Sequence, residues 1–244
     1  MSNLQIIHED NDIIVCYKPA GVAVQTRRLG QQDMVSLLKN YRAKKKEPPY
    51  IGVVHRLDQP VEGIMVFAKN EKAAANLSKQ VADRSIGKYY YAIGQMNENT
   101  DGKLDDLYSE VLSGNEKPIV LTDYMTFDTR TNVGQILPQK PDAAQIKKDK
   151  NIKKAELEYT VIDVKDKLVC LDIKLHTGRH HQIRLQMAHA GMPLVGDSKY
   201  GVAEKGQQPA LCSYRLEFNH PTSGKALDFE ITPHNELFGW CRLH

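Results

Sequence analysis

Short runs of β-branched and aromatic residues recur along this chain, and most of them are separated by turns rather than by helices. Examples are IIVCY at 13–17, YYYAI at 89–93 and the two runs on either side of the polar turn at 165–167. A regular alternation of strands and helices would indicate a parallel sheet, and the sequence lacks that alternation. We therefore predict an α+β fold with a mixed, largely antiparallel β-sheet and a few flanking helices.

Three segments have the periodicity and the end signals of amphipathic helices: 33–46, 71–85 and 180–191. Asp33 and Asn70 can cap the first two helices, and Gly191 can end the third. The apolar stripes are expected at Met34, Leu37, Leu38 and Tyr41 in the first helix and at Ala74, Leu77 and Val81 in the second.

Other parts of the chain give weaker signals. The first strand should end at Lys18-Pro19, and a shorter strand is expected to follow over 22–26. Residues 97–130 indicate only a hairpin or a loop excursion. Residues 131–154 indicate an exposed loop, in which GQIL at 134–137 could belong to a strand.

The cysteines and the hydropathy favour a soluble, cytoplasmic protein. A chain of 244 residues can bury a sizeable core without disulfides. Its four cysteines form no CxxC pair, which argues against a zinc site and against a disulfide framework: Cys16, Cys170, Cys212 and Cys241. No secretory signal is evident, and no apolar stretch approaches the ~18 residues of a membrane span.

The positive charge is concentrated in two blocks. The formal net charge is only +3, from 33 Lys and Arg against 30 Asp and Glu. The lysines gather in YRAKKKE at 41–47 and in IKKDKNIKK at 146–154. Such blocks suit a polyanionic partner, although a solvated helix face and an exposed loop would give the same pattern.

The stretch HRLDQPVEG, residues 55–63, carries the first candidate for chemistry. Asp58 follows an apolar run and precedes a turn that Pro60 and Gly63 impose. Its carboxylate could simply accept backbone hydrogen bonds in that turn. Alternatively, the turn could hold the carboxylate rigidly as a reagent. A second dense motif at 177–201, with two arginines, two adjacent histidines and a Gly-Asp turn, favours the second interpretation.

Three motifs together resemble the RluA-type family of RNA pseudouridine synthases. They are HRLDxxxxGxxxFAK, KxYxA at Lys88, Tyr90 and Ala92, and TGRxHQIRxxxxxxGxPxxGDxxYG. The likeness runs in order through nearly the whole catalytic domain, which makes it more specific than any single motif. It implies the pseudouridine synthase fold as a single catalytic domain over 1–244, without a separate N-terminal RNA-binding domain and without a cofactor.

The resemblance also implies which residues carry the reaction. Asp58 would be the nucleophile or the stabilising carboxylate, and Arg184 would pair with it and keep it charged. Tyr90 would stack on the target base and could transfer the C5 proton. By strand alternation Tyr89 and Tyr91 should face the other side of the sheet. We expect Asp58, Tyr90 and Arg184 to converge in one basic cleft.

Four further residues are expected to contact the substrate by the same resemblance: His55, Arg56, Arg179 and Gln182. Arg56 would help to hold the target nucleotide out of the stack. The chain departs from the family pattern at Val61-Glu62, where the family usually has Thr-Ser, and at His180, where it usually has Thr or Ser. Glu62 would place a negative charge near the expected path of the phosphate backbone, which puts the choice of RNA in doubt.

The expected partner is ribosomal or transfer RNA, bound by a monomer without a metal or a membrane. A non-catalytic RNA-binding or ribosome-assembly protein that keeps the fold is the alternative. A metal-dependent hydrolase is a weaker alternative, because His180 and His181 should point about 100° apart on a helix.

Overall fold

The chain folds into two compact units, and the computed structural model describes residues 4–243 except 27, 29, 97–105, 107–108, 115–116, 202 and 205. The first unit comprises Met1–Lys88 and Cys212–Pro233, and the second comprises Tyr89–Leu211 and His234–His244. Most strand pairs are antiparallel, which confirms the predicted α+β class. The single domain over 1–244 stays a prediction. Among the described helices, none has the length and apolar character needed to cross a membrane.

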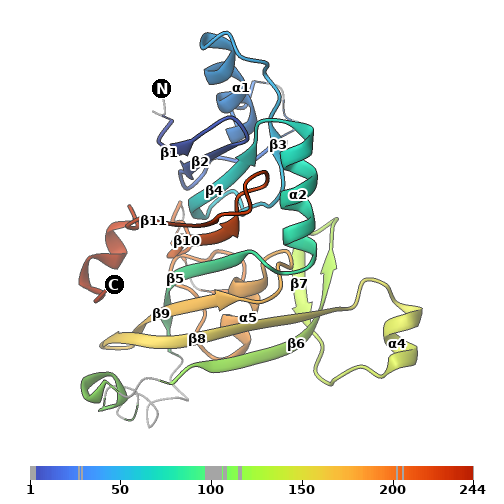
Figure 1. Ribbon diagram of the computed structural model, residues 1–244. Helices are drawn as coiled ribbons and strands as arrows, with labels where there is room; N and C mark the ends of the chain where they lie inside the picture. The colour runs from blue at the N-terminus through green and yellow to red at the C-terminus, as the bar shows by residue number, and fades with distance from the viewer. Residues whose placement is uncertain are drawn as a thin grey trace. The chain divides into compact units, whose positions relative to one another are not determined.

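The first unit is built around a mixed sheet (Figure 1). Its strands are β1 (Ile6–Glu9), β2 (Ile13–Lys18), β3 (Gly52–Val53), β4 (Glu62–Ala68), β10 (Leu211–Asn219) and β11 (Ala226–Glu230). The order is β1-β2-β4-β10, with β3 on β4 and β11 on β10. Of the pairs described in this unit, only β4 and β10 run parallel.

Gly63 allows β4 to approach β10 closely at the point where the chain leaves the HRLD turn. Its φ is +140°, and a Cβ there would lie 2.5 Å from the backbone nitrogen of Ser213. Any side chain would therefore clash with the partner strand. This contact fixes the start of β4, and with it the end of the turn that carries Asp58.

Helices α1 (Met34–Lys44) and α2 (Glu71–Ala82) begin at the predicted caps. The Asp33 carboxylate forms a capping box with Ser36, and the Asn70 side chain accepts from the backbone of Ala73. Helix α2 lies beside β3 and β4 (Figure 1). Its Leu77 belongs to a buried apolar cluster. The stripe predicted for α1 is confirmed in part: Met34 and Leu38 are buried, but Val35 and Arg42 are buried in place of Leu37 and Tyr41.

The second unit contains an antiparallel sheet in the order β5-β9-β8-β6-β7. Its strands are β5 (Gly87–Gln95), β6 (Ile119–Asp128), β7 (Val133–Ile136), β8 (Lys153–Lys165) and β9 (Leu168–Leu175). Its remaining named elements are α4 (Ala143–Lys148), α5 (Gln182–His189) and the 3-10 helix η2 (Glu236–Trp240). The predicted hairpin is confirmed, since β8 and β9 are joined through Asp166 at φ +55°.

The structure differs from the sequence predictions in three regions. The described end of 97–130 contains β6, and 131–154 contains β7, α4 and the start of β8, so this stretch is not simply a loop. Helix α4 stands on an arm between β7 and β8 (Figure 1). The expected strand over 22–26 is absent: Ala23 makes one isolated bridge to Asp33, because its carbonyl accepts from the first turn of α1.

Candidate active site

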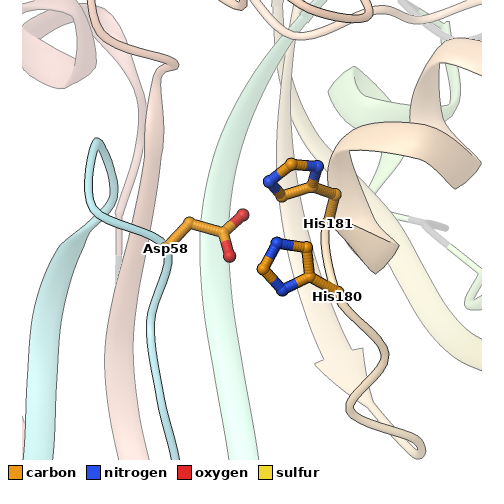
Figure 2. A group of neighbouring side chains, drawn as sticks. All are labelled: Asp58, His180 and His181. Atoms are coloured by element: carbon orange, nitrogen blue, oxygen red, sulfur yellow. The ribbon is translucent and has the colours of Figure 1, made fainter. Parts of the chain in front are cut away.

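The Asp58 side chain projects from the turn between β3 and β4 (Figure 2). Hydrogen bonds fix the backbone of this turn. The amide of Val61 donates to the Asp58 carbonyl at 3.0 Å. The next residue, Gln59, is tied to the Pro-Ala-Gly turn: its carbonyl accepts from the Gly21 amide at 2.9 Å, and its side chain donates to the Gly21 carbonyl at 3.0 Å. Two turns thus lock each other, and the half-buried Asp58 side chain projects from a rigid backbone.

The ammonium group of Lys18 is the buried centre of this arrangement. It donates to the carbonyls of Pro19, Val22 and Gln59 at 2.8–3.1 Å, and the side chain is fully buried. Burial lowers the pKa of Lys18 to about 7, while the charges of Asp58 and Glu62 act in the opposite direction. Through these three hydrogen bonds, Lys18 connects the Pro-Ala-Gly turn to the turn that carries Asp58.

Glu62 does not face a phosphate path as predicted. Its residue is only 4% exposed, and its carboxylate accepts a 2.5 Å hydrogen bond from the hydroxyl of Tyr17. Burial, together with that bond and the charge of Glu62, raises the pKa of Tyr17, so the phenol stays a donor. The prediction was wrong because β2 lies alongside β4 and supplies a buried partner for the carboxylate.

His55 and Arg56, which precede Asp58, have different environments. The Nε2 atom of His55 accepts a hydrogen bond from the backbone amide of Val66 in β4 at 3.1 Å. Burial, and then the charge of Lys88, lowers the pKa of His55 to about 3. The His55 ring is therefore neutral, and its hydrogen bond connects the HRLD segment to β4. Arg56, by contrast, is exposed.

The three tyrosines of β5 occupy different sites, as strand alternation predicts. Tyr90 is 6% exposed and lies opposite Ile173 of β9. Tyr91 is buried in the core at 1% exposure, while Tyr89 is half-buried with the Lys174 ammonium 5.8 Å from its ring centroid. The role of Tyr90 at the target base stays a prediction, and no role in the reaction is assigned to Tyr89 or Tyr91.

Arg184 on α5 is held by a residue to which the sequence analysis gave no role. The fully buried carboxylate of Asp197 accepts from its Nε at 2.8 Å and from its Nη2 at 2.7 Å. Burial alone would raise the pKa of Asp197, but the Arg184 bond and charge and two backbone amides hold that pKa below its usual value. The Tyr200 ring lies 5.4 Å from the guanidinium carbon. The motif GDxxYG contains both partners, so its Asp and Tyr were the available signal.

Gln182 orders the loop that leads into α5. Its amide oxygen accepts from the Thr177 hydroxyl at 2.8 Å and from the Arg179 backbone at 2.9 Å. Its amide nitrogen donates to the carbonyl of Glu156 and to the side chain of Gln186. All of these bonds are internal to the fold, and Gln182 is 3% exposed. The Arg179 side chain donates to the Lys154 carbonyl at 3.0 Å.

His180 and His181 do not lie within a helix as predicted. Helix α5 begins at Gln182, and His181 precedes it with a left-handed φ of +55°. This conformation brings the two imidazole rings together, with centroids 4.2 Å apart (Figure 2). The 100° argument against a metal was therefore wrong, and the absence of a metal stays a prediction that a chelator can test.

The predicted convergence of Asp58, Tyr90 and Arg184 stays a prediction, because Asp58 belongs to the first unit and the other two residues belong to the second. Within each unit, however, hydrogen bonds hold the backbone of the Asp58 turn and the guanidinium of Arg184.

Comparison with known proteins places these motifs in context. A family model described as RNA pseudouridylate synthase matches residues 12–189. The chain is 30% identical to an uncharacterized RNA pseudouridine synthase of Aquifex aeolicus, over 99% of this chain and 74% of that protein. It is 31% identical to the ribosomal large subunit pseudouridine synthase D of Pseudomonas aeruginosa, over 97% of this chain and 70% of that protein.

Two solved structures share the fold. Human RNA pseudouridylate synthase domain containing 1 aligns with a TM-score of 0.68 at 20% identity, over 97% of this chain and 86% of that one. Human RNA pseudouridylate synthase domain containing 4 aligns with a TM-score of 0.66 at 18% identity, over 94% and 89%. At these identities the likeness establishes the fold alone.

Proposed function

Because this chain belongs to the RNA pseudouridylate synthase family, we propose that it converts uridines at particular positions of structured RNA into pseudouridine. The enzyme is an RNA pseudouridine synthase, an isomerase. The match over residues 12–189 carries the proposal, since that range contains both HRLD at 55–58 and TGRHHQIR at 177–184. The names of several relatives favour ribosomal RNA as the substrate, with transfer RNA as the second class to test.

The proposed reaction conserves atoms and electrons, so it requires no cofactor. The bond between C1′ of the ribose and N1 of uracil breaks, the base turns, and a bond forms between C1′ and C5. The C5 proton leaves and N1 receives a proton, so nothing is oxidised or reduced. Asp58 would attack as the nucleophile or assist elimination as a carboxylate. The rigid turn held by Lys18 supports this role, because a reacting group must be held in a defined geometry.

Arg184 and Tyr90 would serve the same uridine. The guanidinium would favour the ionised form of Asp58 in a dry site. Asp197 orients that guanidinium by two hydrogen bonds, which suits a group that must approach a carboxylate in one geometry. Tyr90 would stack on the uracil, a contact worth roughly 1–3 kcal/mol for a base, and it is the candidate for relaying the C5 proton, giving up its own hydroxyl proton as it takes the one from C5.

The remaining candidates divide by their environment. The exposed Arg56 would support the flipped nucleotide, and Arg179 would bind RNA near its loop. His55 and Gln182 would act by positioning, because their polar atoms bond to Val66 and to the loop before α5.

The proposal is tested by tritium release from RNA labelled at uridine C5, with a large-subunit ribosomal RNA transcript and a transfer RNA pool as separate substrates. Asp58→Asn removes one charge at constant size and should slow release at least about 10³-fold. Asp166→Asn makes the same change in the exposed β8–β9 turn and should leave release unchanged, because Asn accepts the left-handed conformation. Thermal melting should show that both variants are folded.

Release that persists in Asp58→Asn would remove Asp58 from the chemistry. If the wild type released no tritium from either RNA, while Asp58→Asn bound RNA as tightly as the wild type, the non-catalytic RNA-binding alternative would replace the proposal. Prior treatment with a chelator should leave release unchanged. Loss of activity that added metal restores would favour the metal-dependent alternative.

A further inference from the structure

Four aromatic rings lie in contact near the start of α5 in the second unit. None of them has a role in the proposed isomerisation. The His180 ring stacks at a tilt on His181, with centroids 4.2 Å apart, and meets Phe127 of β6 edge-on at 4.3 Å. His181 in turn meets Phe127 at 5.6 Å and Tyr200 at 5.5 Å, both edge-on. The four rings thus form one continuous cluster.

The local backbone is shaped to hold this cluster. A left-handed φ is uncommon for a residue other than glycine, and His181 adopts one at +55° immediately before the helix. Three contacts fix the surroundings. The Tyr200 hydroxyl accepts from the Gly134 amide at 2.7 Å and shares a 2.9 Å hydrogen bond with His181 Nδ1. His180 Nε2 lies 3.2 Å from the Asn132 side-chain oxygen.

The solvent exposure of the rings increases from His181 through Phe127 to His180. His181 is buried at 6% exposure, Phe127 is half-buried and His180 is exposed. One cation lies close to the outer end of the cluster: the Lys199 ammonium donates to the Asn132 carbonyl at 2.6 Å, and the side chain of the same Asn132 contacts His180. An exposed planar ring with a lysine nearby matches a ligand that is planar and negatively charged.

We propose that His180 and Phe127 form a stacking site for an unpaired nucleobase of the bound RNA. The inference rests on the proposed function only in taking RNA as the partner. Bases outside a helix stack on aromatic and imidazole rings, and their phosphates pair with neighbouring cations.

The test measures stacking directly, with a 12-nucleotide single-stranded RNA that contains one 2-aminopurine, a fluorescent base whose emission falls when it stacks. Binding to the wild type should quench the emission. His180→Thr should weaken binding by about tenfold and remove part of the quenching. His180→Phe should restore both, because it keeps a ring. His189→Ala is the matched control, since it removes an exposed imidazole from the far end of α5 and should change neither measurement.

The outcomes separate this proposal from the isomerase proposal. Equal affinity and equal quenching for the wild type, His180→Thr and His180→Phe would overturn the stacking site, even if all three released tritium normally. Conversely, a loss in His180→Thr that His180→Phe restores would support the stacking site even if the wild type released no tritium, and then only the isomerase proposal would fall. Phe127→Ala, checked for folding by thermal melting, should reproduce the effect of His180→Thr.

Discussion

At the scale of single residues, buried polar groups hold the side chains that the proposed reaction needs. Lys18 donates to three carbonyls in the Pro-Ala-Gly turn and the Asp58 turn, and Asp197 accepts two hydrogen bonds from the Arg184 guanidinium. Gln182 uses both ends of its amide inside the fold. A buried polar group left without a partner costs about 1–3 kcal/mol, so such networks have little freedom to rearrange. The network therefore fixes the positions of Asp58 and Arg184 within their own units.

Gln182→Ala tests whether this glutamine positions the loop or contacts the substrate. The change removes partners from Thr177, Arg179 and Glu156, so we expect the free energy of unfolding to fall by about 2–4 kcal/mol. Urea denaturation measures this loss. Gln182→Glu should also destabilise the protein, because a carboxylate cannot donate to the Glu156 carbonyl. Unchanged stability with a raised KM would instead support the direct substrate contact predicted from the sequence.

His55 should remain neutral through the acidic range. Burial and the charge of Lys88 lower its pKa to about 3, whereas an unfolded histidine titrates near 6.5. As the pH falls from 6.5 towards 3, the unfolded chain binds a proton that the folded chain does not, so the protein loses stability across that window. NMR of the ring carbons should show no His55 titration between pH 8 and 4. A midpoint near 6.5 would contradict the buried placement.

At the scale of elements, an ion-pair cluster ties α1 to β1 and β4. The Glu9 carboxylate of β1 lies 2.8 Å from the ammonium groups of Lys45 and Lys69 and accepts from the Tyr41 hydroxyl at 2.8 Å. Burial tends to raise the pKa of Glu9, but these three partners together lower it to about 2. Lys45, in the first basic block of the sequence, therefore supports the fold.

Glu9→Gln should reveal this cluster through its pH dependence. The lowered pKa means that the charged carboxylate stabilises the folded state fully above about pH 4.5, and that this stability is lost as the pH falls to about 2. We expect the variant to be less stable at pH 7 by up to about 3 kcal/mol, with the difference shrinking steadily below pH 4.5. Urea midpoints at pH 7, 4 and 3 measure it. A difference independent of pH would show that packing, not charge, is responsible.

Helix starts and one hairpin were predicted correctly, because residues close in sequence determine them. Asp33 and Asn70 mark helix starts because their side chains satisfy exposed backbone amides, and both helices begin there. The hairpin at Asp166 was also predicted from the sequence, because two β-rich runs flank a polar turn. Strand β6 was not predicted: Ile119 and Val120 are exposed, so its pattern lacks the alternation that marks a half-buried strand.

Two features of the site depended on contacts that no local pattern contains. The burial of Glu62 follows from the tyrosine that β2 places beside it, 45 residues earlier in the chain. The pairing of the His180 and His181 rings follows from the left-handed conformation of His181, which the hairpin at Asn132 and the Tyr200 hydroxyl support. The motifs contain these residues, but the orientation of their side chains depends on tertiary structure.

At the scale of the whole molecule, one arm of the chain carries an excess of positive charge. Residues 137–154, which run from the end of β7 into the start of β8, contain six lysines and two aspartates, a net +4 against +3 for the whole chain. Lys147 and Lys148 lie in α4, whose residues are all exposed. An exposed arm that carries more than the chain's entire net charge suits a polyanion. Because Lys45 is paired with Glu9, this arm tests RNA binding more cleanly than the block at 41–47.

Replacing Lys147 and Lys148 by Ala should weaken RNA binding and flatten its dependence on salt. Each phosphate contact contributes roughly 0.7–0.9 to the slope of log affinity against log salt, so losing two contacts lowers the slope by up to about 1.8. Binding to ribosomal RNA transcripts at several salt concentrations measures it. Lys72→Ala with Lys79→Ala is the matched control, because it removes two exposed lysines from α2. An equal effect of both pairs would mean that binding senses overall charge and that the arm has no special part in it. No change in slope for the α4 pair would show that its lysines are only solvated.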